Sequence, residues 1–196
     1  AIKTANNQSM TAITSLSGVT AGNLVLISTE TASSSSTITF ASGIDSTYKE
    51  YIFKYYDVHP SAGVRLAVNF RDGSTAYDAT KTSTFFEAYQ NEAGTSTSVD
   101  YVTDYDLAQS TAVQSIGYIG NENDESCAGT LHLYDPSSTT FVKHYIATTP
   151  GYHGSNLALT SYVAGYCNVT AAIDGVQFSM TSGNIDSGTF KMYGVV

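Results

Sequence analysis

The sequence has few basic residues, no tryptophan and no long apolar run. Its 196 residues include 8 Lys and Arg against 17 Asp and Glu, a net charge of −9. A surface that follows a phosphate backbone needs clustered basic side chains, so nucleic acid is not an expected partner. A membrane-spanning helix needs about 20 largely apolar residues in a row, and no stretch approaches that length. The sequence therefore favours neither a nucleic-acid-binding protein nor a membrane protein.

Cysteine is also scarce, with only Cys127 and Cys167 present. The two thiols could form one disulfide or stay free, and a reducing cytoplasm favours free thiols. One pair of cysteines does not indicate a zinc site. Residues 1–10 lack the basic start and apolar core of a secretory signal, so export is not expected.

Tyrosine, glycine, serine and threonine dominate what is present. There are 15 Tyr and 16 Gly, Ser and Thr make up about a quarter of the chain, and charged residues reach only 13%. This balance favours strands and polar turns over helices. A chain of this length can bury a hydrophobic core as one domain. We therefore expect an all-β protein.

Apolar and polar residues alternate with the period of half-buried strands in many segments. Residues 64–70 are the clearest one-sided case, and residues 48–58 carry aromatic side chains on both faces. Loops or turns are expected at residues 33–36, 92–98 and 150–154 because Ser, Gly and Pro gather there. About nine or ten short strands predict an antiparallel β-sandwich, and a jelly roll is one topology that fits.

The C-terminal stretch, residues 173–196, holds two alternating runs separated by residues suited to turns. The apolar positions of the two runs are Val176, Phe178, Met180, Phe190 and Met192. Gly and Asn between the runs permit the positive φ that a tight turn needs. The pattern predicts a hairpin whose last strand closes the domain. Val64, Leu66, Val68, Phe70, Val176, Phe178 and Met180 are the predicted core residues.

This stretch also carries a family resemblance. Residues 177–195 read Gln-Phe-Ser-Met-Thr-Ser-Gly-Asn-Ile-Asp-Ser-Gly-Thr-Phe-Lys-Met-Tyr-Gly-Val, which is similar to the terminal segment of small β-rich virion proteins of tailed bacteriophages, notably those of marine cyanobacteria. Residues 48–60 and 63–73 resemble the paired strands that such proteins carry upstream. Family members more often have Ile and Leu where this chain has Phe190 and Met192, a difference in core filling that leaves the fold expectation intact.

The resemblance implies a structural virion protein that is made in the host cytoplasm and not exported. A capsid decoration or cement protein is expected first, or else part of a tail appendage. Its partners would be other virion proteins, such as the major capsid protein or tail proteins, and further copies in a homo-oligomer. The alternative is a carbohydrate-binding or receptor-binding (adhesin) module of a tail fibre, in which exposed loop tyrosines such as Tyr101 or Tyr152 would hold the ligand.

The N-terminal residues 1–20 are expected to form an arm or an edge segment, and residues 21–196 a single β-sandwich domain. The apolar residues of the arm have neither strand nor helix period. They could order against a neighbouring subunit or belong to a frayed edge strand. The possible assembly contacts are Ile2, Met10, Ile13 and Leu16.

Candidates for chemistry are weak. Residues 121–125 offer oxygen atoms of the kind that calcium prefers, but they lack the spacing of a calcium-binding loop, and a solvated acidic turn is expected. Asp100, Asp104 and Asp106 are expected to lie in a polar loop, with a cation or sugar hydroxyl as the alternative. The histidines, which show no metal-ligand spacing, are His59, His132, His144 and His153. The sequence predicts no enzyme, and no catalytic, metal or cofactor site.

Overall fold

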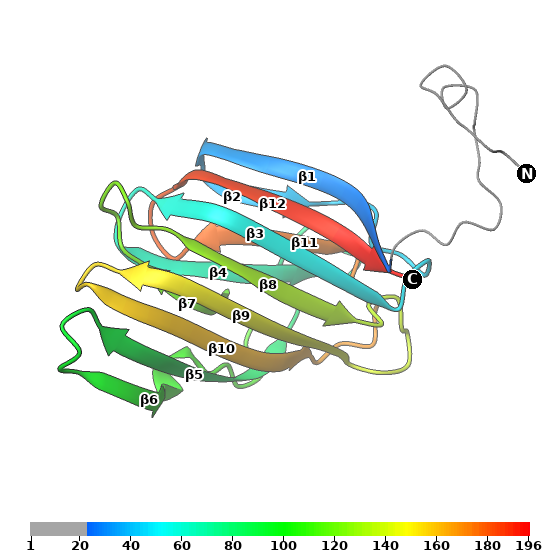
Figure 1. Cartoon of the computed structure of the whole chain (residues 1–196). Coiled ribbons are helices and arrows are strands. Elements are labelled where there is room, and N and C mark those ends of the chain that lie inside the picture. Colours follow the sequence, from blue (N-terminus) through cyan, green and yellow to red (C-terminus); the bar gives the residue numbers. More distant parts are fainter. Residues whose placement is uncertain (1–22) are drawn as a thin grey trace, which may run out of the picture.

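The computed structural model describes residues 23–196, which form two antiparallel sheets packed face to face (Figure 1). In spatial order, the eight-stranded sheet contains β1 (Leu24–Ser35), β12 (Ile185–Val195), β3 (Glu50–Pro60), β8 (Cys127–Tyr134), β9 (Lys143–His153), β10 (Leu157–Cys167), β5 (Lys81–Asn91) and β6 (Thr97–Tyr101). The four-stranded sheet contains β2 (Thr37–Phe40), β11 (Gly175–Met180), β4 (Val64–Arg71) and β7 (Gln114–Ile119). A 3-10 turn, η1 (Thr103–Tyr105), follows β6. The predicted all-β sandwich is confirmed.

The chain crosses repeatedly from one sheet to the other. It changes sheet at every connection from β1 to β5, at both connections of β7 (from β6 and to β8), and at both connections of β11 (from β10 and to β12). The sheet with the order β2-β11-β4-β7 faces the part of the large sheet with the order β3-β8-β9-β10-β5-β6. This is the topology of a jelly roll, which has two facing four-stranded sheets. Here the three strands β8, β9 and β10 stand where a jelly roll has a single strand. The pair β1 and β12 extends the large sheet at one edge.

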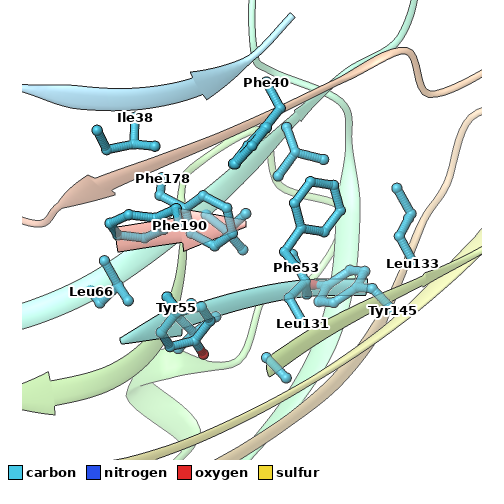
Figure 2. Close-up of a cluster of buried hydrophobic side chains, with 14 of the residues drawn as sticks. Ile38, Phe40, Phe53, Tyr55, Leu66, Leu131, Leu133, Tyr145, Phe178 and Phe190 are labelled. Carbon is cyan, nitrogen blue, oxygen red and sulfur yellow. The ribbon is translucent and has the colours of Figure 1, made fainter. Parts of the chain in front are cut away.

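The core lies between the two sheets, where strand alternation brings apolar side chains from both. Tyr51, Phe53 and Tyr55 point inward from β3 and are completely buried. Figure 2 shows Phe53 and Tyr55 beside Phe178 and Phe190, and the ring centroids of the last two lie 5.1 Å apart. All seven predicted core residues belong to this cluster, six of them buried and one, Val64, only half-buried.

The predicted C-terminal hairpin is wrong. β11 pairs with β2 and β4 in the small sheet, whereas β12 pairs with β1 and β3 in the large one. The segment is an arch that crosses the sandwich, because Phe178 and Phe190 enter the core from opposite sheets and contact each other there. The expected pairing of β3 with β4 is also wrong, because the two strands lie in different sheets. β12 lies inside its sheet, between β1 and β3.

Three predicted loops also need correction. Ser33–Ser35 belongs to β1, and β6 begins inside the predicted loop at Thr97. Pro150 lies within β9 rather than in a turn. Proline has no N–H to donate, and the pairing of β8 with β9 is interrupted there, between Cys127–Gly151 and Thr130–Thr148. No helix within residues 23–196 is long and apolar enough to cross a membrane.

Candidate functional site

The eight-stranded sheet has one face on the core and one open, outer face (Figure 1). On β9 and β10 the inward side chains Tyr145 and Val163 are buried, whereas the outward Ile146, Ala158 and Ala164 are exposed. Strand alternation alone places these residues on opposite faces. The outer face is therefore a broad surface on which side chains of six or more adjacent strands are presented to solvent.

Aromatic and aliphatic side chains gather where this face meets the β6 edge. Phe86 pairs with Tyr101 on one side and with Tyr162 on the other. The rings of Phe86 and Tyr162 stack with centroids 4.8 Å apart. Exposure is 40% for Phe86, 58% for Tyr101 and 73% for Val99. We call Phe86, Val99, Tyr101 and Tyr162 the β6-edge patch.

Hydrogen bonds of Asp106 fix the edge of this patch. Its carboxylate accepts a 2.8 Å bond from the backbone N–H of Phe85 and a 2.5 Å bond from the hydroxyl of Tyr101. The hydrogen bond to Asp106 raises the pKa of Tyr101, which keeps the hydroxyl protonated as a donor. Asp100 accepts a bond from the Ser98 hydroxyl. These two acidic residues thus support the local backbone and side chains of the β6 region.

An open pocket of about 630 Å³ lies on the outer face next to the β6-edge patch. Its floor is formed by small residues of three neighbouring strands, Ala128, Pro150 and Ala158. Gln90, Glu92 and Tyr152 contribute polar groups at its rim. Tyr152, which the sequence suggested as a ligand-holding tyrosine, therefore lines a pocket, whereas Tyr101 lies in the patch.

A largely buried ion pair lies beneath β5, on the inner side of the sheet. Arg65 donates 2.6 and 3.3 Å bonds to the two carboxylate oxygens of Glu87, and both side chains are only 12% exposed. The guanidinium carbon of Arg65 lies 3.7 Å from the ring centroid of Tyr105. Ser161 donates a further bond to Glu87. This cluster ties β4 of the small sheet to β5 and β10 of the large one.

Two lysines on the inner face, Lys81 and Lys143, are completely buried. Cys167 lies between them, because it is the β-sheet partner of Lys81 on β5 and of Lys143 on β9. Lys81 Nζ donates to Asn69 Oδ1 at 2.5 Å and to the carbonyl of Ala79 at 2.7 Å. Burial lowers the pKa of Lys81 to about 8. Burial raises the pKa of Cys167 to about 12, although the two lysines pull it down. A thiol held protonated in this way is not a reactive nucleophile.

The acidic turn at residues 121–125 is not wholly solvated. Glu125 is buried, and its carboxylate accepts a 2.6 Å bond from the N–H of Glu122. The carbonyl of Glu125 accepts a 2.7 Å bond from His59 Nδ1. Residues 23–196 contain no group of three or more His, Cys, Asp or Glu placed to hold a metal ion.

The histidines make separate contacts rather than one site. His132 Nδ1 lies 2.6 Å from a carboxylate oxygen of Glu50, and the ring of His153 stacks on Tyr118 at 4.1 Å. Burial lowers the pKa of His153, and the charge of Arg65 lowers it further. At neutral pH this ring is therefore an uncharged part of the packing. Cys127 and Cys167 are both buried and unpaired.

No family model matches this chain, and the search of curated proteins found no match. Its function must therefore be argued from the surface just described. The predicted assembly contacts Ile2, Met10, Ile13 and Leu16 lie outside the described residues.

Sequence reasoning missed most of the patch and the floor of the pocket. The alternation of Val99 and Tyr101 was a usable signal for a strand there. The pocket floor had no comparable signal, because isolated Ala and Pro residues become neighbours only when β8, β9 and β10 pair.

Proposed function

We propose that this protein is a structural component of a bacteriophage virion, a capsid decoration or cement protein that acts by assembly rather than by catalysis. The observation that carries the proposal is the β6-edge patch. The resemblance of residues 177–195 to phage virion proteins supports it, and jelly rolls are a common architecture of viral capsid domains. The binding partners would be the major capsid protein or tail proteins, together with further copies of this chain.

The chemistry of the β6-edge patch suits contact with another protein. Soluble monomers rarely expose large contiguous apolar surface, and such patches mark interaction sites. Tyrosine and phenylalanine are enriched in the centres of interfaces, and charged residues are depleted there. All four patch residues are uncharged, and the neighbouring carboxylate of Asp106 is already hydrogen-bonded to Tyr101 and to the backbone, which limits the cost of covering it.

The position of the patch adds a second means of contact. Among the described residues 23–196, β6 is the last strand of its sheet and pairs with β5 only. The outer side of an edge strand offers backbone N–H and C=O groups to an incoming strand. A partner could therefore pair with β6 while its apolar side chains cover Val99 and Tyr101.

A charged substitution in the patch tests this proposal. Val99→Lys places a charge at a position that is 73% exposed, and the matched control Phe141→Lys does so at a loop position that is 71% exposed. We expect unchanged unfolding temperatures for both, because neither side chain is in the core. Incorporation into particles that lack their own copy should fall at least about tenfold for Val99→Lys only. Equal incorporation of the two variants would contradict docking through the patch.

The second candidate is a carbohydrate-binding or receptor-binding module of a tail fibre. The observation that favours it is Tyr152 at the rim of the pocket, since tyrosine combines an apolar ring with a hydrogen-bonding tip. Host attachment and particle incorporation of two variants distinguish the two candidate functions. Loss of host attachment by a Tyr152→Ala variant that is still incorporated normally supports the adhesin, and loss of incorporation by Val99→Lys supports assembly.

A further inference from the structure

The pocket beside the β6-edge patch exists because small residues coincide on neighbouring strands. Ala158 of β10 pairs with Tyr152 of β9 and with Gln90 of β5. Pro150 lies on the same outer face, where the pairing of β8 with β9 is interrupted. The larger side chains of Gln90 and Tyr152 rise around the floor that these small residues leave. The result is a wide, open depression of about 630 Å³, a volume within the roughly 300–1,000 Å³ range of ligand pockets.

The floor and the rim of the pocket differ in chemistry. Ala128, Pro150 and Ala158 offer aliphatic C–H groups to a ligand. At the rim, the side chains of Gln90 and Ser126 make no hydrogen bond to any other described residue and can turn to a ligand. Asn91 also lines the pocket, but its amide oxygen already accepts bonds from the N–H groups of Thr95 and Ser96.

Tyr152 and Glu92 form an adjustable pair at the rim. The hydroxyl of Tyr152 lies 3.2 Å from a carboxylate oxygen of Glu92 and 3.2 Å from the amide oxygen of Asn156. The tyrosine can therefore donate its proton to Asn156 and leave both oxygens of Glu92 free to accept bonds from a ligand. Partial burial and the hydrogen bond to Glu92 raise the pKa of Tyr152, so the hydroxyl remains protonated at neutral pH.

Charge restricts the ligand class. Within the part of the chain that the structure describes, no Lys or Arg lines the pocket. Glu92 is anionic, and the whole chain carries a net charge of −9. A phosphate, a sulfate or an acidic sugar would meet unfavourable electrostatics. A neutral polyol is complementary to both parts of the pocket. Its hydroxyls can donate hydrogen bonds to the carboxylate and amide oxygens of the rim, and its C–H groups can cover the apolar floor.

We propose that this pocket binds a neutral saccharide, with one sugar ring over Ala128, Pro150 and Ala158 and its hydroxyls bonded to Gln90, Glu92, Ser126 and Tyr152. This inference rests on the second candidate function above, because it names the ligand class of the same pocket. It does not rest on assembly through the β6-edge patch, so the failure of either proposal leaves the other open to its own test. A virion protein with both surfaces would be held to the particle by one and would contact glycans of the host surface with the other.

The test is a titration of the full chain, followed through backbone amide NMR signals, with glucose, galactose, mannose and N-acetylglucosamine in turn. At least one of these sugars should shift the signals of Glu92, Tyr152 and Ala158 in a saturable manner. For the sugar that binds, the analogue that carries a carboxylate on the same ring, such as glucuronate for glucose, should bind at least about tenfold more weakly. Glu92→Gln should narrow that difference, because it removes the repelling charge.

A matched pair of variants locates the site. Ala158 and Ala164 are both exposed on the outer face of β10, and only Ala158 lines this pocket. Ala158→Leu should fill the floor and raise the dissociation constant at least about tenfold, whereas Ala164→Leu should leave it unchanged. The proposal is overturned if none of the four sugars shifts the pocket signals, if the two leucine variants bind the sugar equally, or if the carboxylate analogue binds as tightly as the neutral sugar.

Discussion

Arg65 of β4 neutralises the charge of Glu87 of β5 between the two sheets. Its guanidinium holds the carboxylate of Glu87 through two bonds and packs against the ring of Tyr105. A buried ion pair adds little net stability compared with an apolar pair, but the loss of one partner leaves a charge without compensation. The cluster therefore matters most when only one of its members is removed.

Replacement of Arg65 tests this account. Arg65→Met should lower the free energy of unfolding by about 3–5 kcal/mol, because Glu87 stays buried without its cation. Urea denaturation measures the change. Lys49→Met is the control, since the Lys49–Asp135 pair is 79% and 42% exposed and should matter by less than about 1 kcal/mol. A double variant, Arg65→Met with Glu87→Leu, should recover much of the loss, and a failure to recover would refute the charge explanation.

Lys81 predicts a pH dependence of stability. Its pKa is lowered from 10.5 to about 8 by burial, so the unfolded chain binds this proton more tightly than the folded one. The contribution of Lys81 to the free energy of unfolding is therefore lowest below pH 8 and rises as the pH increases from about 8 to about 10.5. The measurement is the difference in unfolding free energy between the protein and Lys81→Met across that range. The buried thiols and tyrosines affect both proteins alike, so their effects cancel when one unfolding free energy is subtracted from the other. A difference in unfolding free energy that does not change with pH would contradict the prediction.

At the scale of elements, the arch from β11 to β12 is the feature that joins the two sheets at the C-terminal end. Phe178 and Phe190 contact each other across the core, and both are completely buried. An arch and a hairpin share the same local pattern of alternation and turn residues. The choice between them is made by the contacts that each strand finds in the core.

Truncation of one arch residue should therefore be costly. Phe178→Ala should lower the free energy of unfolding by about 3–5 kcal/mol, through lost burial and the cavity left behind. Val99→Ala is the exposed comparison, and its effect should stay within about 0.5 kcal/mol. Chemical denaturation of both variants measures the difference. Similar losses for the two variants would mean that the arch is not anchored as the structure indicates.

At the scale of the whole molecule, the two sheets formed by residues 23–196 have unequal numbers of strands, eight against four. The small sheet covers the inner face of the large one, and the outer face stays open with the β6-edge patch and the pocket on it. The proposed assembly and binding surfaces therefore both lie on the larger sheet, away from the core.

The N-terminal segment provides a prediction at this scale. If the segment orders against a neighbour and adds nothing to the core described for residues 23–196, a chain without residues 1–20 should keep the unfolding temperature of the full chain. If Ile2, Met10, Ile13 and Leu16 are buried on a neighbour, the truncated chain should be incorporated less well into particles. Their burial would contribute about 25 cal/mol per Å² of apolar surface, less the cost of ordering the segment. Unchanged melting together with unchanged incorporation would remove the arm from the assembly proposal.

Part of the site could be predicted from the sequence and part could not. Tyr152 was a candidate because exposed tyrosines suit ligand contact, and it lines the pocket. Ala128, Pro150 and Ala158 could not be foreseen, since their only shared property is that strand pairing brings them together. The pairing of Arg65 with Glu87 was equally invisible, because it joins two sheets.

The sequence by itself determined the all-β class, the strand at residues 64–71 and most of the core, because alternation is a local property that each strand carries. The tertiary structure decided which sheet each strand joins, that the C-terminal stretch is an arch, and where the outer face forms a pocket. These features depend on side chains far apart in the chain that compete for one core. Local periodicity is the same for every such arrangement, so only the packing of the whole molecule selects among them.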